Sequence, residues 1–103
     1  MKTQTAPEIE IGEEQQQETA YEPLFRVIIH NDDVTPMDFV VQVLLSIFML
    51  LPPDAVDVMY TAHYQGEALV QILPRSEAET RINKAHFAAG LEGYPLHFSM
   101  EPE

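Results

Sequence analysis

The fold is decided by one stretch of the sequence, FRVIIHNDDVTPMDFV at residues 25–40. Its first five residues are mostly apolar and predict a buried strand, with Arg26 facing outward. The Asn31-Asp32-Asp33 run predicts a turn, because short polar side chains hydrogen-bond to the backbone next to them. Thr35 predicts a helix N-cap, with Pro36 at the first helical position, where its missing N–H costs nothing. The stretch therefore predicts a strand, a polar turn and a helix in direct succession.

Two helices follow this turn in the prediction. The first begins at Pro36 and has an apolar face at helical spacing, formed by Phe39, Val40, Val43, Leu44, Ile47 and Phe48. The second begins at Pro52-Pro53 and ends before Gly66, a residue type that is common just after a helix. Between the two helices, residues 49–51 are unusually apolar for a connecting loop. They indicate either a partner surface or additional core, and additional core is the favoured interpretation.

The second half of the chain predicts a strand, a helix and a strand. A mostly apolar run at residues 69–73 and an alternation of apolar and polar residues at 96–100 predict the two strands. Ser76 and Glu79 have the spacing of a capping box and predict the start of the helix between them. The order β-α-α-β-α-β predicts a small α/β (α+β) domain, in which a three-stranded antiparallel sheet packs against three helices.

Composition limits the possible partners. The chain has 17 acidic and 5 basic residues, and its net charge of −12 repels nucleic-acid phosphates and anionic lipid, so neither is a predicted partner. Without cysteine it has no disulfide, thiol nucleophile or zinc–thiolate site. Residues 1–23 hold six of the glutamates and little apolar surface, which predicts a flexible acidic extension ahead of a core domain at residues 24–103. The extension is either a solvated leader or a segment that a partner engages.

The apolar segments are too short for a membrane span. Residues 1–23 contain no apolar core of a signal peptide, and the most apolar stretch, residues 39–51, falls short of the ~20 residues that cross a bilayer. We therefore expect a soluble protein in the cytoplasm.

Enzyme and metal chemistry have little support. The sequence lacks a glycine-rich phosphate loop, a nucleophile elbow and an HExxH motif, so no catalytic residue is predicted. His30, Asp32, Asp33 and His63 are acceptable metal ligands by type, but they lack EF-hand or paired-histidine spacing. No metal and no other cofactor is predicted.

A binding site for an ammonium group beside an apolar side chain has more support. Asn31 and Asp33 lie two residues apart on the turn and can converge on one point, and neutral His63 can accept a hydrogen bond. Met37 and Met59 are flexible and polarizable, and they suit the lining of an apolar pocket. Simpler roles stay open from these residues alone: turn formation for Asn31 and Asp33, and core packing for the others.

Several separate motifs resemble one family. Residues 31–40, NDDVTPMDFV, are similar to the NDDYTPMEFV signature of the ClpS adaptors, which recognise N-degrons in bacteria and plastids. The resemblance continues without gaps at Met59, at HYQG (residues 63–66), at AETR (78–81) and at GYPL (93–96). It covers residues 24–101.

The resemblance implies an adaptor and no enzyme. Such adaptors bind proteins whose first residue is Leu, Phe, Tyr or Trp and deliver them to a Clp-family AAA+ unfoldase, of the ClpA or ClpC type, for degradation by ClpP. By position, Asn31, Asp33 and His63 would hold the substrate's α-ammonium, with Asp32 nearby. The hydrophobic pocket would be lined by Ile29, Thr35, Met37, Val40, Met59, Ala62 and Leu96. The compartment would be the cytoplasm, or the stroma in a plastid-bearing source.

The resemblance also implies a docking surface and includes two departures. The third helix, with Glu79 and Arg81, would lie near the surface that docks on the unfoldase's N-terminal domain, and the unfoldase would engage the N-terminal extension. Ala62 stands where the family often has Val or Ile, so the pocket is expected to be wider and to favour large aromatic residues over Leu. Ser76 replaces a frequent Glu in the docking region.

Overall fold

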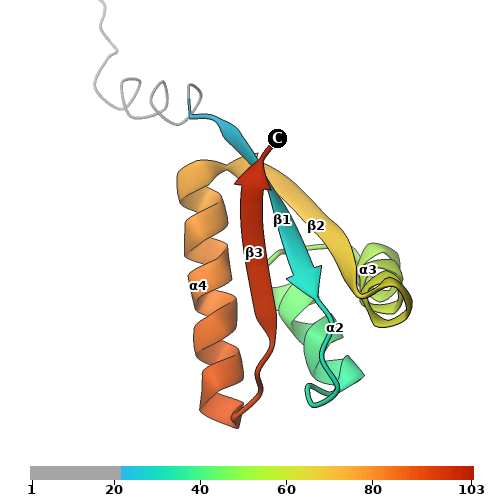
Figure 1. The fold of residues 1–103 in the computed structure, drawn as a ribbon. Coiled ribbons are helices and arrows are strands. Elements are labelled where there is room, and N and C mark those ends of the chain that lie inside the picture. Colours follow the sequence, from blue (N-terminus) through green and yellow to red (C-terminus); the bar gives the residue numbers. More distant parts are fainter. Residues whose placement is uncertain (1–21) are drawn as a thin grey trace, which may run out of the picture.

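The structure, a computed structural model, describes residues 22–103 and contains three strands and three helices (Figure 1). In chain order they are β1 (Leu24–His30), α2 (Met37–Ser46), α3 (Pro52–Gln65), β2 (Glu67–Pro74), α4 (Arg75–Glu92) and β3 (His97–Pro102). The predicted β-α-α-β-α-β order and the antiparallel sheet are confirmed. Most of the predicted acidic extension lies outside the described residues.

The sheet places β1 at its centre. The strand order is β2-β1-β3, and both ladders are antiparallel. Val27 and Ile29 point into the core, because alternate residues of a strand share a face, and they are 0% and 1% exposed. The ladder to β2 shifts between Val27 and Ile28, where Val70 has no partner on β1, as in a β-bulge. The turn after β1 therefore emerges from the most buried strand of the sheet.

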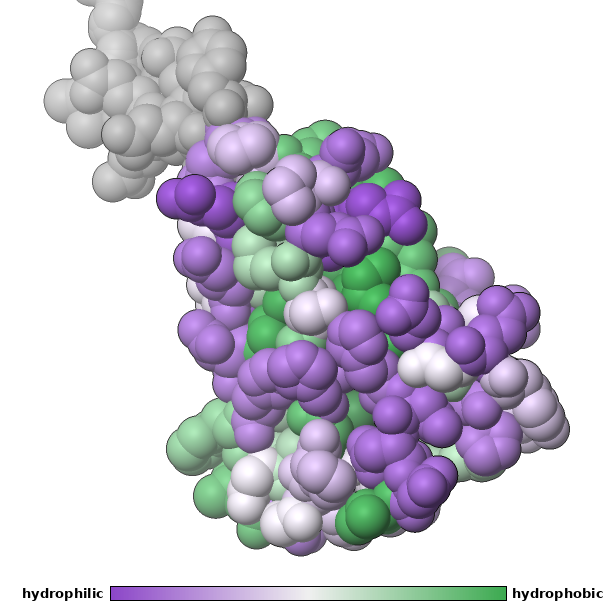
Figure 2. Space-filling model, viewed as in Figure 1, coloured by the Kyte–Doolittle hydropathy of each residue, from purple (hydrophilic) through white to green (hydrophobic). Residues whose placement is uncertain are grey.

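One hydrophobic core joins the sheet to all three helices. Contacts link α3 to β2 and α2 to α3, while α4 begins directly after β2 and packs against β3. All three helices supply buried residues to this core, and the residues from α2 belong to its predicted apolar face. The buried helix residues include Val40, Val43, Leu44, Ala55, Met59, Ala62, Ala78, Ile82, Ala85 and Ala89. Figure 2, viewed from the same direction as Figure 1, shows that the visible surface of the domain is mostly hydrophilic. Within residues 22–103, no helix has the length and apolarity needed to cross a membrane.

Both predicted side-chain N-caps are wrong. Helix α2 begins one residue later than predicted, with Pro36 as its N-cap, and the Thr35 hydroxyl donates instead to Asp32 Oδ2 at 2.9 Å. Helix α4 has no side-chain bond from its own N-cap residue, so the capping box of Ser76 and Glu79 does not form.

The carboxylate of Glu22 takes the place of that capping box. It accepts the backbone N–H and the hydroxyl of Ser76, at 2.8 and 2.9 Å. These two bonds lower the pKa of Glu22, and Pro23 adds a backbone contact by accepting the N–H of Arg75 at 3.1 Å. Glu22 and Pro23, which the sequence analysis assigned to the extension, therefore contact the start of α4.

The apolar segment between α2 and α3 is largely on the surface. Met49 and Leu51 are 69% and 68% exposed, so the prediction of additional core is wrong for these two residues, while Leu50 packs partly against the core. Met49 has a φ of 60°, a left-handed conformation that only this non-glycine residue adopts within residues 22–103. The side chains at 49 and 51 therefore add apolar surface to the domain instead of core.

Candidate functional site

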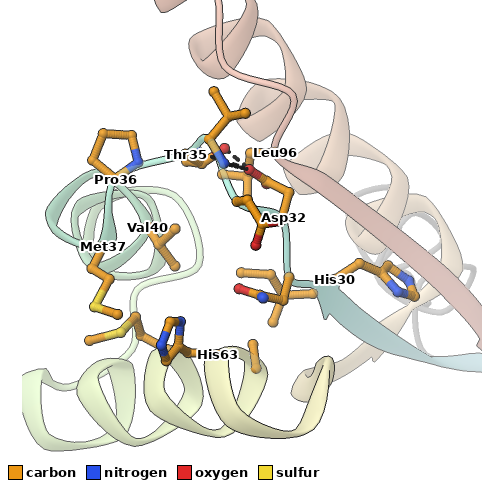
Figure 3. Close-up of a pocket in the computed structure, with 14 residues that line it drawn as sticks. His30, Asp32, Thr35, Pro36, Met37, Val40, His63 and Leu96 are labelled. Carbon is orange, nitrogen blue, oxygen red and sulfur yellow. Dashed lines mark hydrogen bonds between the residues drawn. The ribbon is translucent and has the colours of Figure 1, made fainter.

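A pocket lies where the turn after β1 meets α2 and α3. Its lining comes from residues 29–37, Val40, the last turns of α3, and Leu96 just before β3. The cavity has a volume of about 340 Å³. In Figure 3, Met37 and Val40 from α2 and His63 from α3 face the same space.

Asp32 fixes the shape of the turn. Its Oδ1 accepts the backbone N–H groups of Val34 and Thr35 at 2.8 and 2.7 Å, and its Oδ2 accepts the Thr35 hydroxyl. Burial raises the pKa of Asp32, but the hydrogen bonds from Thr35 and Val34 outweigh it and hold the pKa below its ordinary value of 3.8. Both carboxylate oxygens of Asp32 therefore accept hydrogen bonds within the turn, and its role is to support the turn.

The turn is also tied to the end of α3. The backbone N–H of Asn31 donates to the carbonyl of Gly66 at 2.9 Å. Gly66 has a φ of 95° and ends α3 as predicted, which glycine allows without strain. His63 lies in the last turn of α3, so this backbone bond and the adjacent pairing of His30 with Glu67 hold the end of that helix next to the polar turn.

The mouth of the pocket has three acceptors without internal partners. Asn31, Asp33 and His63 are exposed and line the cavity, and none of their side chains makes a hydrogen bond within residues 22–103. Carboxamide, carboxylate and neutral imidazole groups can all accept from an ammonium group. The charge-assisted bond to the carboxylate is expected to be the strongest of the three.

The interior of the pocket is apolar. All seven residues predicted for the hydrophobic pocket belong to its lining: Ile29, Thr35, Met37, Val40, Met59, Ala62 and Leu96. Five of them, all but Thr35 and Met37, are buried at 1–9% exposure, while Met37 is 40% exposed at the mouth. The site therefore combines a polar rim with an apolar floor, and strand, helix and loop residues all contribute.

Three lining residues were not predicted for the pocket: His30, Val34 and Pro36. Val34 and Pro36 belong to the lining, and their positions between predicted pocket residues were the available signal. The His30 ring points away from the cavity in Figure 3, so the four candidate metal ligands do not converge. In the part of the chain that the structure describes, no three His, Cys, Asp or Glu side chains are arranged to hold a metal ion.

The two predicted docking residues differ in availability. Glu79 is exposed on α4. Arg81 donates to the Phe48 carbonyl at 3.1 Å and pairs with Glu77, and its side chain is only 22% exposed. The guanidinium of Arg81 therefore has a structural role inside the domain.

Comparison with known proteins assigns the family. The sequence profile described as "ATP-dependent Clp protease adaptor protein ClpS" matches residues 20–99. The chain is 41% identical to the ClpS of Desulforapulum autotrophicum over 83 residues, which is 81% of this chain and 80% of that protein. It is 44% identical to ClpS 1 of Rhodopseudomonas palustris over 80 residues, covering 78% of each chain.

A solved structure agrees with this assignment. The structure of Agrobacterium tumefaciens ClpS2 bound to L-phenylalaninamide matches with a TM-score of 0.75 and 40% identity, over 79% of this chain and 98% of that one. The fold, the sequence profile and the relatives lead to the same conclusion: this chain belongs to the ClpS family of Clp protease adaptor proteins.

Proposed function

We propose that this protein binds the free N-terminus of proteins whose first residue is bulky and hydrophobic, and delivers them to a Clp-family AAA+ unfoldase of the ClpA or ClpC type for degradation by ClpP. One observation carries the proposal: three unpartnered acceptors stand at the rim of an apolar pocket. A chain N-terminus offers the matching pair of groups, an ammonium and, next to it, the first side chain. L-phenylalaninamide, the ligand of the Agrobacterium tumefaciens relative, has the same two groups.

The roles of the site residues follow from their chemistry. Asn31, Asp33 and His63 accept hydrogen bonds from the ammonium, and Asp32 holds the turn that presents them. The seven apolar-pocket residues surround the first side chain. Burying a Leu or Phe side chain gives roughly 1.5–3 kcal/mol, and each charge-assisted hydrogen bond about the same. After the cost of association, an affinity near micromolar is expected, about −8 kcal/mol, which suits an adaptor that must release its cargo.

A titration with a short peptide that begins with Phe tests this function, with the amine free and acetylated. Acetylation removes the positive charge, so it should abolish most of the affinity. Asn31→Ala and Asp33→Ala should each weaken binding by more than ~1 kcal/mol, about one hydrogen bond. Asp57→Ala is the matched control, because Asp57 is an exposed carboxylate of α3 outside the pocket. Equal binding of both peptides, or binding of neither, would indicate a module of this fold that modulates an unfoldase without recognising N-termini.

Ala62 bears on the choice of first residue. It is 3% exposed in the pocket lining, and its single methyl leaves room that a branched residue would fill. We expect peptides that begin with Phe or Trp to bind more tightly than one that begins with Leu. Ala62→Val should reduce this difference in affinity. Tighter binding of the Leu peptide to the wild type would contradict the expectation.

Delivery requires a second surface. We propose that the exposed part of α4 around Glu79 docks on the unfoldase's N-terminal domain and that the acidic extension takes part in delivery. Glu79→Ala should weaken binding to that domain while peptide affinity stays unchanged. The cytoplasm, or a plastid stroma, stays the predicted compartment.

A further inference from the structure

Three of the four histidines form a row from α4 across β3 to β1, which meets the pocket lining at His30. The rings of His86 and His97 are stacked, with centroids 5.4 Å apart and an angle of 11° between their planes. The His97 and His30 rings follow at 5.2 Å. We call His86, His97 and His30 the histidine row. Neither the adaptor function nor the hydrophobic core accounts for it.

His86 must be neutral to make its contact with β3. Its Nε2 accepts the backbone N–H of Phe98 at 2.9 Å, so the proton of the neutral ring is on Nδ1. Phe98 is a core residue with 1% exposure. When His86 is protonated, both of its ring nitrogens carry a proton and neither can accept a hydrogen bond. The backbone N–H of Phe98 would then be left without a partner at a buried position.

The surroundings of His86 disfavour its charged form. Burial lowers the pKa of His86 below its ordinary value of 6.5, and the neighbouring His97 lowers it further. The residues three and four positions away on α4 are Ile82, Asn83, Ala89 and Gly90, none of which titrates. No carboxylate of α4 therefore stands one turn away to stabilise a charge on this ring.

A carboxylate of the sheet lies at the other end of the row, next to His30. Glu67 of β2 lies 3.6 Å from His30 Nδ1, and Ser99 Oγ lies 2.7 Å from His30 Nε2. Arg26 and Glu101 pair with each other at 3.4 Å on neighbouring strands. Glu67 can therefore balance a charge on His30, while the stacked rings of His97 and His86 would repel each other if both were protonated.

The row is joined directly to the pocket. His97 follows Leu96, a buried wall of the cavity, and His30 precedes Asn31 at its rim. His30 and His97 are also partners in the ladder between β1 and β3. Figure 1 shows that the lower end of β3 lies next to the end of β1, where the turn begins. A displacement of β3 at this end therefore moves a pocket wall.

We propose that the histidine row makes the fold and the pocket sensitive to pH, so that mildly acidic solution loosens β3 from α4 and weakens the binding of an N-terminal ligand. The direction of this pH dependence follows from the linkage between proton binding and folding. The unfolded chain binds a proton at His86 more readily than the folded one, so stability is fully present above about pH 6.5 and is lost as the pH falls below it. The stability part needs no ligand, while the binding part rests on the proposed function.

His86→Gln tests the proposal, because a glutamine oxygen can accept the Phe98 N–H but does not titrate. Thermal unfolding and titration with the free Phe-initiated peptide are compared at pH 7.5 and 5.5. Between these values the Tm of the wild type should fall by about 4 °C or more beyond that of the variant. The wild type should also lose at least about threefold more affinity than the variant, because protonation of His86 opposes the folded arrangement of β3 and α4. Both proteins carry His63, so its own contribution to peptide binding cancels in the comparison.

His97→Gln provides a second test, since it keeps the His86 bond but removes the neighbouring imidazole with its charge and ring contacts. It should reduce the pH dependence of the Tm as well. Parallel changes of Tm in the wild type and both variants would overturn the proposal. Parallel losses of affinity would overturn the link to the pocket. If neither the wild type nor His86→Gln binds the free peptide at pH 7.5, the proposed function fails. The pH dependence of the Tm in the wild type and the variants then tests the histidine row by itself.

Discussion

The leading turn before α2 (residues 31–36) and the trailing bend after it (residues 48–51) both redirect the chain, but different contacts hold them. In the leading turn a single side chain, Asp32, accepts three hydrogen bonds from residues two and three positions away. In the trailing bend the Phe48 carbonyl accepts from Gln71 at 2.8 Å and from Arg81 at 3.1 Å, and these donors belong to β2 and α4. The side-chain bonds of the leading turn are local, whereas those of the trailing bend come from distant elements.

The two regions also differ in strain and in exposed chemistry. The leading turn has no left-handed residue, and it presents Asn31 and Asp33 at the mouth of the pocket. The trailing bend holds Met49 in a left-handed conformation and exposes its side chain. A locally bonded turn can keep polar groups in place before a ligand arrives, which lowers the cost of binding. The trailing bend has no such arrangement and is best understood as a connection.

Removing Asp32 should have the largest effect. Asp32→Ala deletes three hydrogen bonds, and we expect the free energy of unfolding to fall by about 2 kcal/mol. Hydrogen bonds to a charged group stabilise a fold more than neutral ones do, but the Asp32 carboxylate is partly solvated, which reduces the effect. Affinity for a Phe-initiated peptide should fall with it, because the rim acceptors lose their support. Urea unfolding and peptide titration measure the two effects.

Asp33→Ala is the matched control for that experiment. Its carboxylate makes no bond within residues 22–103, so stability should stay within ~0.5 kcal/mol while peptide affinity falls. If Asp32→Ala were as stable as Asp33→Ala, the turn would be held by its backbone alone, and the contrast with the trailing bend would disappear.

This contrast also explains which features the sequence could predict. The turn after β1, the Gly66 cap and the amphipathic faces depend on residues within a few positions of one another, and the structure has them all. The cap of α4 could not be predicted, because its acceptor, Glu22, lies 54 positions from Ser76. The same holds for the bond from Phe98 to His86, which exists only once β3 and α4 are packed together.

The pocket was predictable for a different reason. Taken alone, Asn31 and Asp33 are ordinary turn formers, and periodicity assigns Met59 and Ala62 only to a core. The family motifs at fixed spacing brought these residues together, and all of them line one cavity. The exposure of Met49 and Leu51 could not be predicted, because an apolar segment usually indicates burial. Their exposure depends on the backbone conformation of the bend, which apolar composition does not reveal.

Removing the distant support of the trailing bend should have an intermediate effect. Arg81→Met keeps the aliphatic part of the side chain but loses the bond to Phe48 and the pair with Glu77, so the free energy of unfolding should fall by about 1–1.5 kcal/mol. Peptide affinity should change less than twofold, because the bend does not line the pocket. Lys84→Met, on an exposed position of the same helix, is the control. Equal losses in the two variants would mean that Arg81 does not hold the bend.

The smallest effect is expected from relieving strain at Met49, and its sign should be opposite. Met49→Gly removes the steric cost of a left-handed side chain, which is about 1–2 kcal/mol, and adds roughly 0.5–1 kcal/mol of backbone entropy to the unfolded state. The 69% exposed Met49 side chain contributes little packing, so the free energy of unfolding should rise by about 0.5 kcal/mol. Val34→Gly in the leading turn, also at an exposed position, relieves no such conformation and should lower stability instead. Chemical denaturation of both variants measures the difference. A gain at residue 34 equal to that at residue 49 would show that the leading turn is strained as well, and that the three bonds of Asp32 hold it against that strain.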